Sequence, residues 1–174
     1  MRLVTISNEI HFYELDSESE LNEYIKEYNG IILEDDVQTK NKFYVFEYLN
    51  NSTKIVLGIL NEGHGIIPHG ILLSNEKVLV ISSDKTIYFY NTISKIIVKN
   101  KKCDSLIYDI INLEDKGKII IYCELGIQSL NVNGDRDWIY DCDNIDDFTL
   151  NDNYIRLITN ETEHKISLLD GKEL

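Results

Sequence analysis

The 174-residue sequence predicts a mainly β protein, organised as an antiparallel meander of short strands with one helix near the N-terminus. Three observations predict this class. Ile, a β-branched residue that favours strands, occurs 27 times. Ala, the strongest helix former, is absent, which disfavours a helix bundle. Short apolar runs recur along the chain and are separated by Asn, Asp, Gly, Lys or Ser, as expected for strands joined by tight turns.

The helix is predicted over residues 17–28, in the segment SESELNEYIKEY. Ser17 and Glu20 have the spacing of a capping box, in which each side chain binds a free backbone N–H of the first turn. The apolar stripe at helical spacing consists of Leu21, Tyr24, Ile25 and Tyr28. The helix is expected to end at Asn29-Gly30, because glycine accepts the left-handed conformation found at helix ends.

Two strands are predicted before the helix, at residues 3–7 and 10–15, and the chain beyond Gly30 is predicted to be β-structure. The further strands are expected at residues 30–34, 42–49, 54–60, 70–74, 77–82, 86–91, 95–99, 106–111, 118–123, 126–132, 137–141, 146–150, 154–159 and 164–169. The short linkers between them favour hairpins. Asn133-Gly134 predicts a two-residue type I′ hairpin, because this turn requires positive φ at both central residues.

A weak repeat links three segments of the second half, residues 69–91, 107–132 and 145–171. Each contains apolar strands separated by polar turns, and the first two segments align with Leu79 equivalent to Ile120. A unit of about 40 residues with three or four strands has the size of a β-propeller blade.

One run in the middle unit, GIQSLNVNGDRDWIY, resembles a recurrent blade segment in which a strand ends in a polar residue, Gly makes the turn and Trp opens the next strand. Residues 69–174 therefore resemble the blades of quinoprotein-like and related propellers. The resemblance implies a partial, propeller-like arrangement, because rings contain about 4–8 blades. A β-sandwich or another antiparallel α+β fold is the alternative. We expect one domain, 1–174, with N-terminal strands and helix in 1–68 and the blade-like repeats in 69–174.

The chain carries 17 basic and 30 acidic side chains, and its formal net charge of −13 disfavours nucleic-acid binding, which requires cationic surface. The charge is uneven: −7 over residues 1–70, +4 over 71–102 and −10 over 103–174. The densest acidic stretch runs from Asp135 to Asp152, where only Arg136 opposes it. Such a stretch is either a solvated loop face or a docking face for a basic partner.

The docking interpretation provides the candidate partner-binding residues. They are Asp135, Asp137, Trp138, Tyr140, Asp141, Asp143, Asp146 and Asp147. Trp138 fits either an interface anchor or the core between blades. Asp141 and Asp143 also match two positions of a calcium-binding loop, but Ile145 and Asp146 stand where an oxygen ligand and a Gly are required. Neither a metal nor a cofactor is therefore expected.

The longest segment without strand character, residues 61–70, contains a second group of candidate residues. Glu62, His64 and His69 are ligand types of catalytic zinc, but they lack the HExxH spacing. The segment is interpreted as a Gly-rich connection stiffened by Pro68. The sequence has neither a GxSxG elbow nor a phosphate-binding Gly-rich loop, and no local motif marks a cysteine as nucleophile, so we do not predict an enzyme.

The compartment is expected to be cytoplasmic. No apolar segment approaches the ~18 residues that span a membrane, and the N-terminus lacks the apolar region of a signal peptide, so no membrane association is expected. The three cysteines form an odd number without CxxC spacing, which is typical of reduced thiols.

A small, acidic, β-rich cytoplasmic chain without catalytic motifs resembles, in size, charge and style, the immunity proteins of bacterial polymorphic or contact-dependent toxin systems. The resemblance implies a non-catalytic protein that neutralises a cognate basic toxin, often a nuclease, by covering its active site with an acidic face. One alternative is a small-molecule or glycan-binding β-module, or an enzyme built on one, using residues 61–70. Another is a structural module of a larger assembly. Open sheet edges also allow a homodimer.

Overall fold

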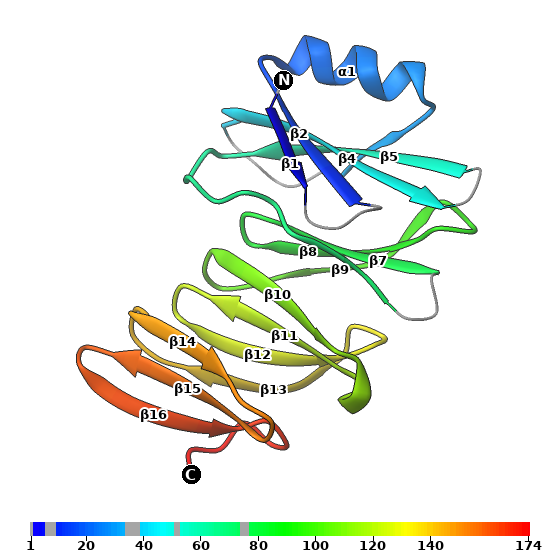
Figure 1. Cartoon of the computed structure of the whole chain (residues 1–174). Coiled ribbons are helices and arrows are strands. Elements are labelled where there is room, and N and C mark those ends of the chain that lie inside the picture. Colours follow the sequence, from blue (N-terminus) through cyan, green and yellow to red (C-terminus); the bar gives the residue numbers. More distant parts are fainter. Residues whose placement is uncertain (1, 6–9, 34–38, 51–52, 74–76) are drawn as a thin grey trace.

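The computed structural model describes residues 2–5, 10–33, 39–50, 53–73 and 77–174. In this part of the chain, four β-sheets follow one another in sequence order and stack face to face, with a helix over the first sheet (Figure 1). Three of the four sheets are purely antiparallel meanders of three or four strands. The predicted fold class, a mainly β meander of blade-like units with an N-terminal helix, is confirmed.

The first sheet has five strands in the order β1-β2-β4-β5-β3. The bounds are β1 (Arg2–Thr5), β2 (Ile10–Leu15), β3 (Ile31–Leu33), β4 (Lys42–Asn50) and β5 (Thr53–Asn61). β3 pairs with β5 in parallel, because α1 (Glu18–Glu27) carries the chain across the sheet between β2 and β3. Part of the strand predicted at 3–7 lies outside the described residues.

The helix begins and ends through local contacts. The Ser17 hydroxyl accepts the N–H of Glu20 (3.2 Å), and the Glu20 carboxylate accepts the N–H of Asp16 (3.0 Å), which is the reciprocal capping that the sequence predicts. At the other end Asn29, and not Gly30, adopts the left-handed conformation, with φ 50°. Gly30 serves a different purpose, because a Cβ there would lie 2.5 Å from the Val56 carbonyl oxygen.

The second and third sheets repeat one four-stranded meander. The second comprises β6 (Gly70–Leu72), β7 (Val78–Ser83), β8 (Thr86–Asn91) and β9 (Ile96–Lys102). The third comprises β10 (Ile107–Leu113), β11 (Lys118–Cys123), β12 (Gly126–Asn131) and β13 (Arg136–Asp141), with the short 3-10 helix η1 (Glu114–Lys116) between β10 and β11. Both have a register shift between their last two strands.

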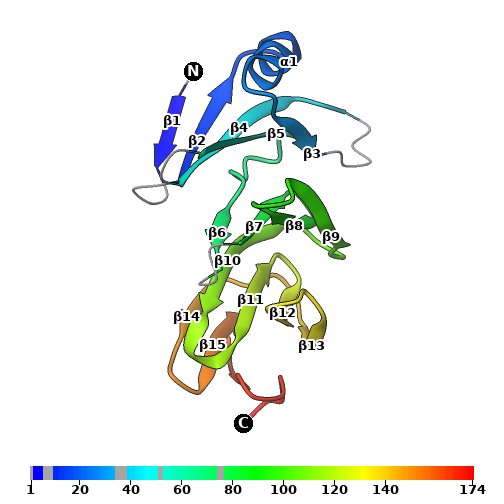
Figure 2. The same ribbon diagram turned by 90° about the vertical axis from the view of Figure 1, so that its right-hand side faces the viewer.

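The fourth sheet has three strands, β14 (Asp147–Leu150), β15 (Tyr154–Thr159) and β16 (Thr162–Ser167). Figure 2 shows the same succession of sheets from the side. Within the described residues, no helix is long and apolar enough to span a lipid bilayer.

Hydrophobic cores fill the spaces between successive sheets, because the central strands are apolar on both faces. In β7, Leu79 and Ile81 pack against the first sheet, whereas Val80 packs against the third. In β11, Ile119 and Ile121 face the second sheet and Ile120 faces the fourth; all six side chains are fully buried. Near-continuous apolar runs such as KIIIYC are thus explained by burial on both faces.

The repeat is real, but the equivalence of Leu79 and Ile120 is wrong by one residue. The central hairpins start at Val78, Lys118 and Tyr154, 40 and then 36 residues apart. Leu79 therefore corresponds to Ile119, and Ile120 lies on the opposite face, because a shift of one residue in a strand exchanges its faces.

Both outer faces of the stack are capped. Leu21 and Ile25 of α1 pack onto the outer face of the first sheet. On the last sheet, Arg156 stands where Ile120 stands one sheet earlier, and it binds Asp147 (3.1 Å) and Glu163 (2.9 Å) on the solvent side. A closed ring would pack these two faces together, so the arrangement is an open stack.

The connection between β12 and β13 differs from the predicted two-residue hairpin. Four residues, 132–135, join the strands, and of these only Gly134 has positive φ (77°). The Asn131 side chain organises the turn by accepting the N–H groups of Asn133 (2.9 Å) and Asp135 (3.0 Å). This side-chain contact replaces the type I′ geometry.

Candidate functional site

The eight predicted partner-binding residues do not form one surface. β13 runs the length of the third sheet, so residues before and after it lie at opposite ends. Asp137 and Asp141 are four residues apart along this strand, which is about 13 Å. Asp135 and Asp137 belong to the end that carries η1, whereas Asp141, Asp143, Asp146 and Asp147 belong to the end that carries the β11–β12 turn.

The first two acids are neutralised by lysines of the fold. Lys99 of the second sheet contacts Asp135 at 2.6 Å, and Lys118 contacts Asp137 at 3.0 Å. The hydrogen bond from Lys99, followed by its charge, lowers the pKa of Asp135 below its usual range. These carboxylates therefore contribute mainly to contacts between neighbouring elements and offer little free charge.

The two aromatic candidates also have partners within the fold. Trp138 is 7% exposed in the core between the third and fourth sheets, and its indole N–H donates to the Leu168 carbonyl at 3.3 Å. Its ring is thus unavailable to a partner, in agreement with the core interpretation. The Tyr140 hydroxyl lies 3.3 Å from His164 Nδ1, and His164 in turn lies 2.7 Å from Glu173.

The remaining acids belong to a larger acidic end of the third and fourth sheets. We use this name for Asp104, Glu124, Asp141, Asp143, Asp146 and Asp147. Asp147 pairs with Arg156, whereas Asp143 and Asp146 accept hydrogen bonds from the uncharged Asn160, at 3.2 and 2.9 Å. Within the described part of the chain, no lysine or arginine lies within 4 Å of the carboxylates of Asp104, Glu124 or Asp141. Of the six carboxylates of the acidic end, only that of Asp147 is therefore in an ion pair with a described residue.

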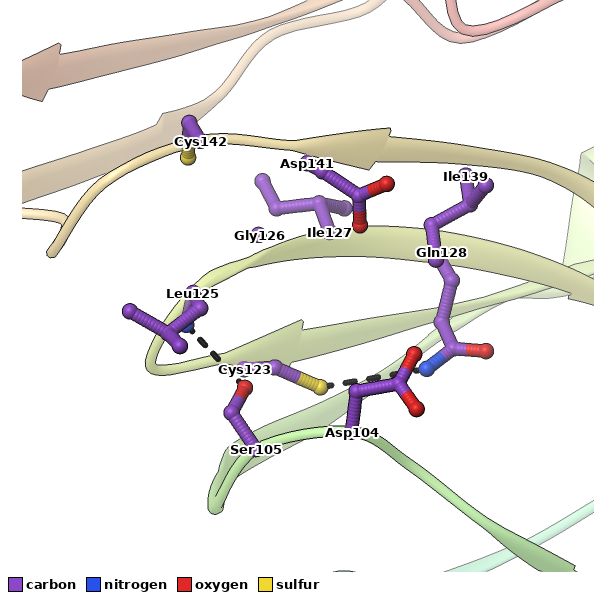
Figure 3. A pocket seen from close by; sticks show the side chains of 10 residues that line it. All are labelled: Asp104, Ser105, Cys123, Leu125, Gly126, Ile127, Gln128, Ile139, Asp141 and Cys142. Carbon is purple, nitrogen blue, oxygen red and sulfur yellow. Dashed lines mark hydrogen bonds between the residues drawn. The ribbon is translucent and has the colours of Figure 1, made fainter.

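A pocket of about 360 Å³ opens at the acidic end. Its ten lining residues are Asp104, Ser105, Cys123, Leu125, Gly126, Ile127, Gln128, Ile139, Asp141 and Cys142 (Figure 3). Asp104 extends from the loop before β10, and Asp141 extends from β13 on the other side of the pocket (Figure 3). The Ser105 hydroxyl accepts the Leu125 N–H at 3.1 Å and so holds the β11–β12 turn against this loop.

Two buried thiols lie beside the pocket. The Gln128 side-chain amide donates to the Cys103 sulfur (3.0 Å) and approaches the Cys123 sulfur (3.9 Å). A hydrogen bond with Cys123, aided by the charge of Lys101, lowers the pKa of Cys103, and the same contact together with burial raises the pKa of Cys123.

The pKa of the third cysteine, Cys142, is sensitive to the charge of the acidic end. It is half-buried at the rim of the pocket. Burial, followed by the charges of Asp143 and Asp141, raises the pKa of its thiol. These two carboxylates are thus close enough to penalise a further negative charge.

The Gly/His segment does not assemble as a metal site. His64 lies 2.8 Å from Glu62, but His69 instead pairs with Asp109 of β10 at 3.0 Å. Among the described residues, no group of three or more His, Cys, Asp or Glu side chains is placed to hold a metal ion. The segment connects the first and second sheets, and Asp109 anchors it to the third.

Asp104 and Glu124 were not among the residues singled out from the sequence. They lie outside the dense acidic stretch, so local charge counting does not find them. The repeat contains a signal that could have identified Glu124. When the repeat units are aligned with offsets of 40 and 36 residues, the turns of their central hairpins, at residues 84–85, 124–125 and 160–161, fall at the same end of the stack. A correct alignment would have placed Glu124 beside the segment 141–147.

Comparison with known proteins supports the fold and leaves the activity open. No protein-family profile and no curated protein matches the chain. Among solved structures, dihydro-heme d1 dehydrogenase NirN, determined in complex with DHE, aligns with a TM-score of 0.55 at 10% identity over 76% of this chain and 31% of that one. Hsv2 of Kluyvelomyces marxianus aligns with a TM-score of 0.39 at 11% identity, over 61% and 36% of the two chains. The chain spans about a third of the length of either propeller-like neighbour, and the first similarity identifies a propeller-like blade arrangement.

Proposed function

We propose that this chain is a non-catalytic binding protein that neutralises a basic protein partner, in the manner of an immunity protein, by covering the partner's active site with the acidic end. The gathering of carboxylates outside ion pairs at the acidic end is the observation that carries the proposal. Six carboxylates gather there and a single arginine, Arg156, pairs with one of them, whereas Asp135 and Asp137 at the opposite end are each bound by a lysine.

The physical basis is electrostatic complementarity. Clustered negative charge speeds encounter with a basic surface and sets the orientation of docking. A nuclease is the expected class of partner, because its active site binds nucleic acid through cationic groups that a carboxylate surface can occupy instead. The activity is therefore inhibition of such a partner by occlusion.

The test combines capture with charge reversal. The chain is immobilised and incubated with extract of its own source, and the captured protein is identified and assayed for nuclease activity with and without the chain. Asp141→Lys with Glu124→Lys is the informative variant, since neither carboxylate is in an ion pair with any residue that the structure describes. Asp115→Lys with Asp152→Lys is the matched control, because both acids are exposed at the opposite end of the sheets.

We expect the acidic-end variant to lose capture and inhibition and the control to retain both. Wild-type capture should weaken as salt rises, because screening reduces the attraction. Equal capture by the two variants would refute the role of the acidic end. Capture of a partner without any inhibition would refute neutralisation.

The predicted homodimer is a separate proposal. The outer strand β9 leaves Ile96 and Val98 about half exposed on an open sheet edge. Such an edge can pair with a second copy. Analytical ultracentrifugation measures the stoichiometry, and a strictly monomeric chain at high concentration would refute it.

A further inference from the structure

Two of the three cysteines form a pair in the core between the second and third sheets. Cys103 follows β9 and Cys123 ends β11, and both side chains are 4% exposed within the same hydrophobic cluster, where the two thiols share a hydrogen bond. Cys142 packs on the other side of the third sheet, against the core that faces the fourth sheet. A disulfide joins only cysteines that already lie side by side, because its Cβ atoms are about 3.5–4.5 Å apart. The structure therefore singles out Cys103 and Cys123.

The polar neighbour of this pair suits a sulfur that carries negative charge. The side-chain Nε2 atom of Gln128 lies 3.0 Å from the Cys103 sulfur and 3.9 Å from the Cys123 sulfur. A neutral thiol is a weak acceptor, whereas a thiolate accepts a charge-assisted hydrogen bond, so this amide favours ionised Cys103. The hydrogen bond with Cys123 and the charge of Lys101 act in the same direction, and the pKa of Cys103 is lowered although burial opposes this. Because the thiolate is the nucleophile in thiol oxidation, Cys103 is the reactive member of the pair.

The pocket at the acidic end gives a small oxidant access to the pair. Cys123 is one of the residues that line it (Figure 3). The pocket volume of about 360 Å³ far exceeds the ~30 Å³ of a water molecule, and hydrogen peroxide is only slightly larger than water. Peroxide is also uncharged, so the carboxylates around the pocket do not repel it.

We propose that Cys103 and Cys123 are a modification site, at which a peroxide oxidises the two thiols to a reversible disulfide. The Cys103 thiolate attacks one peroxide oxygen, the O–O bond breaks, and a sulfenic acid forms while hydroxide leaves and is protonated to water. The Cys123 sulfur then attacks the sulfenic sulfur, the S–O bond breaks, and a second water leaves with the thiol proton. Two thiols are thereby oxidised to one disulfide, and one peroxide is reduced to two waters.

The disulfide fastens the loop after β9 to the end of β11. It encloses residues 103–123, which include β10. The Ser105 hydroxyl already accepts the Leu125 N–H at 3.1 Å, so the new bond adds a covalent link where this loop meets the β11–β12 turn. A cross-link of this kind stabilises a fold mainly by restricting the unfolded chain. The site is a property of the isolated chain and does not depend on the partner proposed above.

The experiment treats the reduced, native chain with a small excess of hydrogen peroxide. Catalase then removes the peroxide, N-ethylmaleimide blocks the free thiols in urea, and the peptides are mapped by mass spectrometry without reduction. We expect a cross-link between Cys103 and Cys123 within one chain, with Cys142 blocked, and dithiothreitol should reverse it. The oxidised chain should unfold at a urea midpoint about 1 M higher. Cys142→Ser should keep both effects, whereas Cys123→Ala should lose both.

A second variant tests the role of the amide. Gln128→Leu removes the N–H donor and keeps a side chain of similar size, so the disulfide should form several-fold more slowly at the same peroxide concentration. An unchanged rate would overturn the role of Gln128.

Other outcomes would overturn the site itself. These are a disulfide that includes Cys142, one that joins two chains, oxidation of Cys103 to higher acids without a cross-link, or a native chain that keeps all three thiols. The peptide map of the wild-type chain decides between them without any variant, so a folding defect in Cys123→Ala would not affect the result.

Discussion

The electrostatic field of the acidic end should be measurable through the reactivity of Cys142. The carboxylates of Asp141 and Asp143 raise the pKa of its thiol, after the larger effect of burial. Replacing both by Asn removes two charges and keeps similar shapes, and an amide oxygen at position 143 can still accept the hydrogen bond of Asn160. The pKa of Cys142 should fall, so its alkylation should accelerate.

The expected size follows from Coulomb's law. Neighbouring side chains in the chain are roughly 7 Å apart, and at the dielectric constant of water one unit charge then costs the thiolate about 0.6 kcal/mol. At low salt most of this electrostatic free energy is unscreened, so the two substitutions together should increase the population of the Cys142 thiolate about fivefold. A thiolate of lower pKa is also a weaker nucleophile, and this effect cancels about half of the increase in the logarithm of the alkylation rate. The net acceleration is about twofold at low salt and disappears near ~1 M salt.

The assay is the rate of iodoacetamide alkylation of the native chain at constant pH, followed by mass spectrometry. Cys103 and Cys123 are buried, so the fast thiol should map to Cys142. Asp115→Asn with Asp152→Asn is the control, because it removes the same two charges at the opposite end of the sheets. A rate that falls, or that rises equally in the control, would refute the assignment of the charge to this end.

Three further predictions concern stability and titration. Gly171→Ala should lower the free energy of unfolding in urea by about 2–4 kcal/mol, because φ is 71° and a Cβ would lie 2.7 Å from the indole ring of Trp138. Gly65→Ala is the control: φ is 83° but the space around it is open, so the loss should be about 1–2 kcal/mol. Ile120→Ala should cost about 2–5 kcal/mol, because the side chain is fully buried between two sheets. Burial raises the pKa of Asp109, but the hydrogen bond and the charge of His69 outweigh this effect and lower the pKa overall. The contribution of ionised Asp109 to the free energy of unfolding should therefore be complete above about pH 4 and lost as pH falls through the lowered pKa. His69→Gln should raise the pKa of Asp109 measured by NMR titration.

The sequence predicts the fold class well because its signals are local. Strands of β11 type are marked by continuous apolar runs, and the helix is marked by its capping pair, Ser17 and Glu20. These features depend on residues a few positions apart, so no knowledge of the tertiary arrangement is needed to find them. The one-residue error between Leu79 and Ile120 has the complementary cause. Where both faces of a strand are apolar, the pattern does not identify which residue faces which neighbour.

The candidate site was only partly predictable for a similar reason. Residues 135–147 are continuous in the sequence, but a six-residue strand separates their two halves in space. The acids before the strand meet lysines from other elements, and these contacts join residues 19 to 36 positions apart. Charge density along the chain therefore identified the correct region and assigned it one surface where the fold makes two.

The capping of both outer faces of the stack favours the strand ends as the place of the proposed partner-binding surface. A repeat of stacked sheets normally continues by burying one more apolar face. In this chain α1 covers the outer face of the first sheet, and Arg156 with its two acidic partners makes the outer face of the last sheet polar. Neither outer face therefore offers a large apolar surface for a partner, while the turns at the acidic end stay exposed and carry charged side chains. For the basic partner that we propose, contact with the loops and carboxylates of the acidic end is therefore the expected mode of binding, and arginine side chains are suited to it.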